Sequence, residues 1–213
     1  MNFDERKNHY SKCGMYNGYD KKNKEREALD YYSTPTEEVE NILSMINIGE
    51  GTILEPCAGG GHMLKGIYNI FPYASVIATD IQDRACKDFE IKTGKEYDFL
   101  SDSYPIKNID YIIMNPPYSV IEPFVMKSLS IANKGVLMLG RLQFLEGENR
   151  FENIFSEYPP NDVYVYVDRI SCYKNGNIQE KMASAQAYAW FYWDLTKADK
   201  KSYVHWIRRM NKK

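Results

Sequence analysis

The chain has 213 residues, a formal net charge of −2 and 44% hydrophobic residues. This length and apolar content suffice for one domain with a substantial core. There is no run of about 18 apolar residues and no secretory pattern, so we expect a cytoplasmic protein without a membrane partner. The near-neutral charge excludes a chain that attracts phosphates over its whole surface. The four cysteines are not closely paired, and with only three histidines they predict no metal site.

The first predicted elements are a polar arm and an amphipathic helix. Residues 1–28 are polar and charged, and we expect a partly ordered arm. Residues 34–37 read Thr-Pro-Thr-Glu, a capping box with proline at the first helical position. The predicted helix then presents apolar residues at the spacing of one helix face, namely Val39, Ile42, Leu43 and Ile46.

Residues 52–61 read Thr-Ile-Leu-Glu-Pro-Cys-Ala-Gly-Gly-Gly, which predicts a short strand, an acid at its end and a glycine-rich turn before a helix over 62–70. The glycines let the backbone pass close beneath a ligand. The carboxylate of Glu55 can bind the ammonium end of an amino-acid-like cofactor. Neither the dinucleotide fingerprint nor the phosphate-binding loop is present, because position 64 is leucine and Gly66 is followed by isoleucine. We interpret Cys57 as a small buried filler rather than a nucleophile.

The next predicted elements are a strand over 75–79 that leads to Asp80, a helix around 83–92 and a strand over 97–100. A further apolar strand over 110–114 runs into Asn-Pro-Pro-Tyr at 115–118. This tetrapeptide suits the methylation of a planar amino nitrogen, whose lone pair is delocalised and therefore poorly nucleophilic. Acceptors aimed at its N–H groups favour the electron-rich nitrogen of the transition state.

The Asn115 side-chain oxygen and the Pro116 carbonyl can act as those acceptors. Proline fixes φ and lacks an N–H, so Pro116 and Pro117 make the turn rigid. Tyr118 offers a flat face on which a planar group can stack. An ordinary turn after a strand, with two prolines by chance, is the alternative.

A helix over 121–132 and a uniformly apolar strand over 135–139 follow, and 163–167 with 186–193 would form a closing pair of strands. Such alternation predicts a parallel sheet with right-handed crossovers and with ligands at the carboxyl ends of the strands. Four polar residues fall at such ends: Glu55, Asp80, Asp98 and Asn115.

The two motifs together resemble the S-adenosylmethionine-dependent amino methyltransferases, in particular the N6-adenine enzymes in which the cofactor loop precedes Asn-Pro-Pro-Tyr. Residues 141–147 and 189–194 are similar to stretches in small phage and prophage DNA adenine methyltransferases, and the resemblance covers about residues 30–195. It implies a Rossmann-like class I methyltransferase fold in a catalytic domain over 29–196. The implied α/β architecture is a mostly parallel seven-stranded sheet with an antiparallel last strand and helices on both faces.

The resemblance also implies a site for S-adenosyl-L-methionine. Tyr32, Thr34 and Pro35 would help to hold its methionine part, Asp80 its ribose hydroxyls, and Asp98 and Phe99 its adenine. The complete expected cofactor site is Tyr32, Thr34, Pro35, Glu55, Pro56, Ala58, Gly59, Gly61, Asp80, Ile81, Asp98, Phe99 and Asn115. The expected catalytic residues are Asn115, Pro116, Pro117 and Tyr118.

The implied reaction is methylation of the N6 amino group of adenine in DNA, with a flipped base received by Tyr118. Adenine methylation in RNA and methylation of a glutamine amide in a protein share the motif and remain alternatives. A protein that binds the cofactor or nucleic acid without catalysis is an alternative of another class. Cytosine C5 methylation is disfavoured, because no cysteine lies near the fourth strand to act as nucleophile.

Two segments are candidates for substrate contacts. The connection 141–185 is the roomiest, and we expect most contacts there, although residues 169–172 depart from the Arg-Pro-Ser-Phe expected of the family. The tail 197–213 has seven lysines and arginines against one acid, with Tyr203 and Trp206 interleaved. That pattern fits either a nucleic-acid surface or a solvated terminal helix. The chain has room for only a small recognition region, so a partner protein could supply target recognition.

Overall fold

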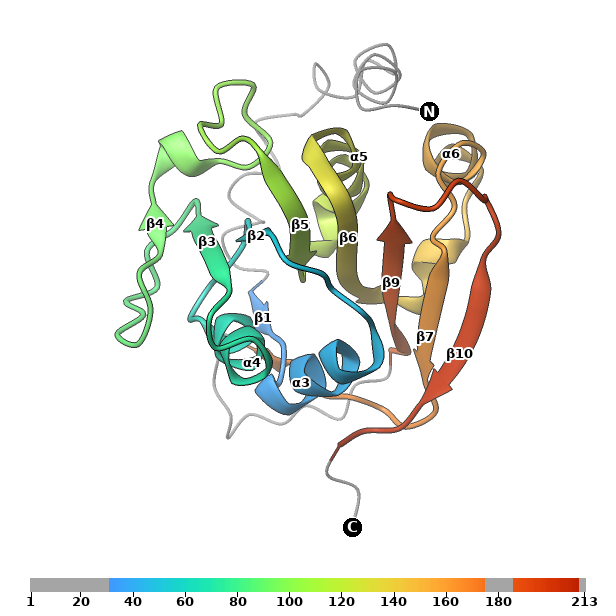
Figure 1. Cartoon of the computed structure of the whole chain (residues 1–213), viewed down its shortest axis with the longest axis horizontal. Coiled ribbons are helices and arrows are strands. Elements are labelled where there is room, and N and C mark those ends of the chain that lie inside the picture. The colour runs from blue at the N-terminus through green and yellow to red at the C-terminus, as the bar shows by residue number, and fades with distance from the viewer. Residues whose placement is uncertain (1–30, 175–185, 211–213) are drawn as a thin grey trace.

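The computed structural model describes residues 31–174 and 186–210 (Figure 1). The predicted arm at 1–28, part of the predicted substrate-contact connection and the last three residues therefore lie outside the described residues. None of the described helices is long and apolar enough to span a membrane.

One eight-stranded sheet forms the centre of the molecule, in the order β10-β7-β9-β6-β5-β2-β3-β4. Strand β9 runs antiparallel to β6 and β7, and all other neighbours are parallel. The strands are β2 (Thr52–Glu55), β3 (Ser75–Asp80), β4 (Lys92–Thr93), β5 (Ile109–Met114), β6 (Ala132–Arg141), β7 (Asp162–Tyr166), β9 (Tyr188–Asp194) and β10 (Tyr203–Ile207). The predicted mostly parallel α/β sheet is confirmed.

Helices cover both faces of this sheet (Figure 1). The α-helices are α3 (Thr36–Met45), α4 (His62–Ile70), α5 (Ile121–Ile131) and the single turn α6 (Glu148–Arg150). Short helical turns are η3 (Lys95–Tyr97), η4 (Tyr118–Val120), η5 (Leu142–Leu145) and η6 (Phe151–Phe155). Val39 of α3 and Met63 of α4 share one core with Ile113, whereas Val125 of α5 shares another with Ile112. Consecutive residues of β5 thus point to opposite faces, as the pleat requires.

A separate two-stranded antiparallel sheet joins β1 (Tyr32–Ser33) to β8 (Tyr173–Lys174). It fastens the segment before α3 to the connection between β7 and β9. The predicted capping box before α3 was wrong: Pro35 is the N-cap residue, no side chain caps the helix, and the Thr36 hydroxyl donates to the His62 carbonyl at 3.0 Å. The proline is therefore one position outside the helix.

Two predicted elements are absent from the segment between β3 and β5. Residues 83–91 form no helix, because the Asp83 carboxylate accepts the N–H of Ala85 at 2.8 Å and Ala85 takes a left-handed φ of 53°. The strand predicted at 97–100 is replaced by β4 and the turn η3. There the Asp98 carboxylate accepts the N–H of Leu100 at 3.1 Å, a local bond that competes with strand pairing.

The basic tail supplies an eighth strand that the sequence did not predict. Residues 203–207 pair in parallel with β7, so the tail is neither a helix nor outside the sheet. The antiparallel strand β9 is consequently followed by β10 in the chain and lies two strands from the edge. The amphipathic pattern of the tail is explained by this edge position, where Ile207 is buried and Trp206 is 72% exposed.

Candidate active site

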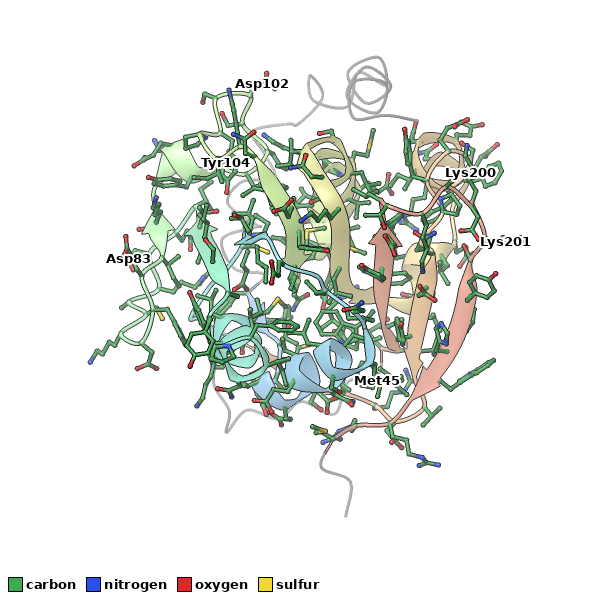
Figure 2. The ribbon with its side chains drawn as sticks, viewed as in Figure 1. Met45, Asp83, Asp102, Tyr104, Lys200 and Lys201 are labelled. Carbon is green, nitrogen blue, oxygen red and sulfur yellow. The ribbon has the colours of Figure 1, made fainter. Side chains whose placement is uncertain are left out.

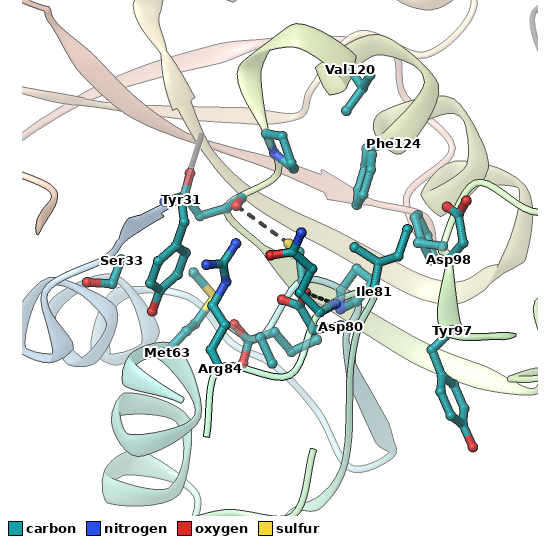
Figure 3. A pocket seen from close by; sticks show the side chains of 18 of the residues that line it. Tyr31, Ser33, Met63, Asp80, Ile81, Arg84, Tyr97, Asp98, Val120 and Phe124 are labelled. Carbon is teal, nitrogen blue, oxygen red and sulfur yellow. Dashed lines mark hydrogen bonds between the residues drawn. The ribbon is translucent and has the colours of Figure 1, made fainter. Parts of the chain in front are cut away.

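A cavity of about 310 Å³ lies at the carboxyl ends of β2, β3 and β5 (Figure 3). Its volume is within the range of small-molecule sites. It is lined by eleven of the expected residues, namely Tyr32, Thr34, Glu55, Pro56, Ala58, Asp80, Ile81, Asp98, Phe99, Asn115 and Pro117. Pro35, Gly59, Gly61, Pro116 and Tyr118 do not line it. The ends of three parallel strands thus gather most of the residues that the sequence singled out.

Tyr31 and Asp80 contact the glycine-rich turn and line the cavity themselves, so Gly59 and Gly61 shape the cavity without lining it. Gly59 has a φ of 54°, and a Cβ there would collide with the ring of Tyr31. Its N–H donates to the Asp80 carboxylate at 2.8 Å, and the next N–H donates to the Tyr31 hydroxyl at 2.8 Å. Gly61 has a φ of 82° and is the N-cap residue of α4. Left-handed backbone and close packing both require glycine here.

Two buried acids, Glu55 and Asp80, line the cavity next to the glycine-rich turn. Burial, reinforced by the charge of Asp80, raises the pKa of Glu55 well above its usual range. Burial also raises the pKa of Asp80, against the lowering effect of N–H donors from Gln82 and Gly59. Both carboxylate oxygens of Asp80 accept backbone N–H groups, whereas no described residue hydrogen-bonds to Oε2 of Glu55. An unpartnered buried carboxylate oxygen is costly, and an ammonium group of a ligand would satisfy it.

Asn115 has a fixed orientation at the mouth of the cavity. Its side-chain nitrogen donates to the Tyr32 carbonyl at 2.9 Å and to the Thr34 hydroxyl at 3.1 Å. Both amide hydrogens are therefore used by the segment before α3, and the Oδ1 oxygen stays available as an acceptor. The backbone carbonyl of Asn115 accepts from the Cys57 thiol at 3.5 Å. Cys57 lines the cavity with its pKa raised well above the usual range by burial, which suits a packing role.

The two prolines after Asn115 differ in whether their backbone carbonyl accepts a hydrogen bond. The Pro117 carbonyl accepts the Val120 N–H at 3.1 Å and so closes the turn, whereas no described residue donates to the Pro116 carbonyl. The structure thus leaves two acceptors, Asn115 Oδ1 and the Pro116 carbonyl, within one residue of each other.

The opposite end of the cavity is apolar. Ile81, Val120 and Phe124 face this space in Figure 3, together with the largely buried Phe99. The Phe99 ring packs against Phe124 with centroids 5.0 Å apart. A flat aromatic ligand group fits between such walls, with Asp98 at the rim as a polar partner.

Sequence reasoning missed several lining residues. Arg84 lies over the Tyr31 ring at 4.2 Å from its centroid, and both line the cavity although neither was among the expected site residues (Figure 3). The role of Tyr32 and Thr34 in orienting Asn115 was also missed, because the contacts join residues more than 80 positions apart. The other lining residues outside the expected site are Ser33, Cys57, His62, Met63, Gln82, Lys95, Tyr97, Leu100, Val120 and Phe124.

Tyr118 does not line the cavity, and other side chains lie against its ring. The guanidinium carbon of Arg141 lies 4.4 Å from the ring centroid. Tyr32 and Tyr188 flank the same ring, with centroids 6.3 and 6.1 Å away. Burial raises the pKa of Tyr118 well above its usual range. The flat stacking face expected from the sequence is therefore covered by the protein's own side chains in this structure.

Several lysines of the basic tail lie at the amino ends of the parallel strands, whereas the cavity lies at their carboxyl ends. Lys197 contacts Asp162 and Asp194 at 3.8 and 3.5 Å, and both acids stand at the amino ends of the parallel strands. Lys200 pairs with Glu157 at 2.9 Å, and Figure 2 shows it beside β10 with Lys201. These lysines cannot extend a substrate surface that begins at Asn115.

Solved structures resemble the whole of this architecture. A protein from Listeria monocytogenes assigned to the class I S-adenosylmethionine-dependent methyltransferases matches with a TM-score of 0.59 at 10% identity, over 99% of this chain and 74% of that one. The methyltransferase subunit of a type I restriction-modification system from Streptococcus thermophilus matches with a TM-score of 0.57 at 12% identity, over 84% and 47%. A dimethyladenosine transferase from Plasmodium falciparum matches with a TM-score of 0.50 at 15% identity, over 77% and 62%.

The chain therefore has the class I methyltransferase fold, as the sequence predicted. It spans about half the length of the type I subunit. No protein-family model and no curated protein matches the sequence.

Proposed function

We propose that this chain transfers a methyl group from S-adenosylmethionine to the N6 amino group of adenine in DNA. The observation that carries the proposal is the orientation of Asn115. Both of its amide hydrogens are bound by Tyr32 and Thr34, which leaves the side-chain oxygen as an acceptor at the mouth of a cavity. A residue needed only for a turn would not require this two-sided anchoring.

The cavity fits the proposed cofactor at each end. Glu55 would bind the ammonium group of the methionine part, since its Oε2 lacks a partner among the described residues. Asp80 would accept from the ribose hydroxyls while its backbone donors hold it in place. Ile81 and Phe99 would enclose the adenine, with Asp98 accepting from its amino group. Bound in this way, the cofactor supplies a methyl group on a sulfonium, which is an activated leaving group.

The protein's own contribution is positioning and acceptance of hydrogen bonds. Asn115 Oδ1 and the Pro116 carbonyl would accept the two N–H groups of the target amine. These bonds strengthen as the nitrogen turns tetrahedral and gains positive charge, so they stabilise the transition state more than the ground state. The target nitrogen would take the methyl carbon from the cofactor, whose sulfur would leave as a neutral thioether, and the surplus proton of the amine would pass to water. Amide oxygens are too weakly basic to retain it.

DNA is favoured over RNA and protein by the segments 141–147 and 189–194, which resemble those of small phage adenine enzymes. The class I fold and the Asn-Pro-Pro-Tyr turn are compatible with all three substrates. The substrate class therefore needs a direct assay.

The test is incubation of the purified protein with methyl-labelled S-adenosylmethionine and separate pools of DNA, RNA and unfolded protein. We expect label in the DNA pool, recovered as N6-methyladenine after digestion to nucleosides. Label confined to RNA or to glutamine would replace the proposed substrate by one of the alternatives. Tight cofactor binding without label in any pool would overturn catalysis itself.

A further inference from the structure

Arg141 is a cation at the proposed active edge with no acidic partner among the described residues. It is the last residue of β6, beside β5, whose end carries Asn115. In the ladder with β9 it pairs with Tyr188, so both side chains project from the same face and both contact Tyr118. Arg141 therefore stands beside the ring on which a target group is expected to stack.

The hydrogen-bonding capacity of Arg141 is little used within the described residues. Its Nε is buried, and no described residue accepts a hydrogen bond from it. Arg150 and Arg209, by contrast, have acceptors: Arg150 binds Glu122 at 2.8 Å, and Arg209 donates to the Arg169 carbonyl at 3.1 Å. Burying a guanidinium N–H without an acceptor costs free energy, so the arrangement needs a compensating use.

The ligand that this arrangement suits is planar and anionic. The guanidinium occupies the place over Tyr118 where a planar base would stack, and it is itself a planar group that stacks on aromatic rings. Once displaced from the ring, it would present paired N–H donors that match the oxygens of a phosphate. A neutral glutamine side chain offers no anion for this cation, whereas each nucleotide of a nucleic-acid strand carries one.

We infer that Arg141 is a substrate-binding residue that leaves the Tyr118 ring when a nucleotide enters and then binds the phosphate beside the target base. The inference rests on the proposed function and deepens it, since it assigns the target site to a nucleic-acid strand rather than a protein. The Tyr118 ring is thus kept covered between substrates and is uncovered by the ligand that replaces the cation.

The test uses a fluorescein-labelled single-stranded DNA of mixed sequence, with S-adenosylhomocysteine present so that no turnover occurs. Affinity is measured by fluorescence anisotropy at several salt concentrations for the wild type, Arg141→Met and Arg141→Lys. Lys201→Met is the matched control, because it removes one exposed positive charge at the opposite end of the strands. Thermal melting and S-adenosylhomocysteine titration check that each variant is folded and binds the cofactor product.

We expect Arg141→Met to weaken binding about 10-fold and to reduce the slope of log affinity against log salt by about 0.7, the value for one phosphate contact to a single strand. Arg141→Lys should keep most of the slope and lose part of the affinity, since it retains charge but not the planar fork. Lys201→Met should match the wild type, and the titration with S-adenosylhomocysteine should be unchanged in all variants.

An Arg141→Met variant that is folded and keeps the wild-type salt slope would overturn the inference and leave the proposed function standing. The same holds if Lys201→Met lowers the slope equally, because the effect would then be one of net charge. A wild-type protein that binds S-adenosylhomocysteine but no DNA strand would instead remove the proposed nucleic-acid substrate, and the inference with it.

Discussion

The two sides of Asn115 are built in opposite ways. On the cofactor side, backbone N–H groups hold Asp80 and the glycine turn around an open cavity, and Glu55 keeps an oxygen without a partner. On the target side, the corresponding space is filled by Tyr118 and the Arg141 guanidinium stacked on it. Under the proposed function, the first site is preformed, whereas the second would be opened by its ligand.

The difference has a physical basis in what each side binds. A small cofactor benefits from a site whose donors and acceptors are already in place, because less ordering is required on binding. An exposed aromatic face and an unsolvated cation would be costly without substrate. Stacking one on the other stabilises both by about 0.5–2 kcal/mol, a contact that a nucleotide can replace.

The largest expected effect is on the preformed side. Gly59→Val should weaken S-adenosylmethionine binding about 100-fold or more, because a β-branched residue is strained at a φ of 54° and its Cβ would collide with Tyr31. Calorimetric titration measures the affinity, and circular dichroism checks the fold. A folded variant that binds normally would show that the glycine turn does not shape the cofactor site.

A second change tests the unpartnered acid. Glu55→Gln should weaken cofactor binding about 10- to 100-fold, since a hydrogen bond between charged groups contributes about 1.5–3 kcal/mol. Cofactor affinity of the wild type should rise with pH through the raised pKa of Glu55, as the ionised form becomes populated. The variant should lack that part of the pH dependence.

The same variant should be more stable than the wild type without ligand. The folded-state pKa of Glu55 is raised, so its contribution to stability is largest when the group is protonated and falls as pH rises through that pKa. At neutral pH the wild type therefore carries a cost that glutamine removes. We expect a higher melting temperature for Glu55→Gln at neutral pH and no difference below about pH 4, where both are neutral. A lower melting temperature at neutral pH would contradict the assigned burial of charge.

The smallest expected effect comes from removing the hydrogen bond between Thr34 and Asn115. Thr34→Val removes one of the two acceptors that orient Asn115, and one hydrogen bond is worth about 1 kcal/mol. We expect kcat to fall about fivefold with little change in cofactor affinity. Thr36→Val is the matched control, because its hydroxyl bonds to the His62 carbonyl instead of Asn115. Equal losses of kcat in both variants would mean that the effect comes from α3 and not from Asn115.

Eleven of the residues that line the cavity were predictable from the sequence, because their signals are local. Glu55 and Asn115 each end an apolar strand, and parallel strands must bring such ends to one edge. The glycines mark a turn that other residues cannot adopt. These features depend on a few consecutive residues.

What the sequence could not predict depends on contacts between distant segments or on competing local bonds. The pairing of Arg141 with Tyr118, and of Asn115 with Tyr32, has no signature in either segment alone. The helix predicted at 83–92 was wrong because the Asp83 carboxylate accepts a hydrogen bond from the Ala85 N–H, which favours a turn over a helix. The strand in the tail was not predicted, because an edge strand with one buried and several exposed residues carries the same mixed pattern as a solvated helix.

The most direct test of the account is Asn115→Ala, assayed in parallel for methyl transfer to DNA and for binding of S-adenosylhomocysteine. If the oriented amide oxygen activates the target nitrogen, the transfer rate should fall at least about 100-fold, as expected when one transition-state hydrogen-bond partner is lost. The affinity for S-adenosylhomocysteine should change by no more than a few-fold. Methyl transfer at close to the wild-type rate would contradict the central claim.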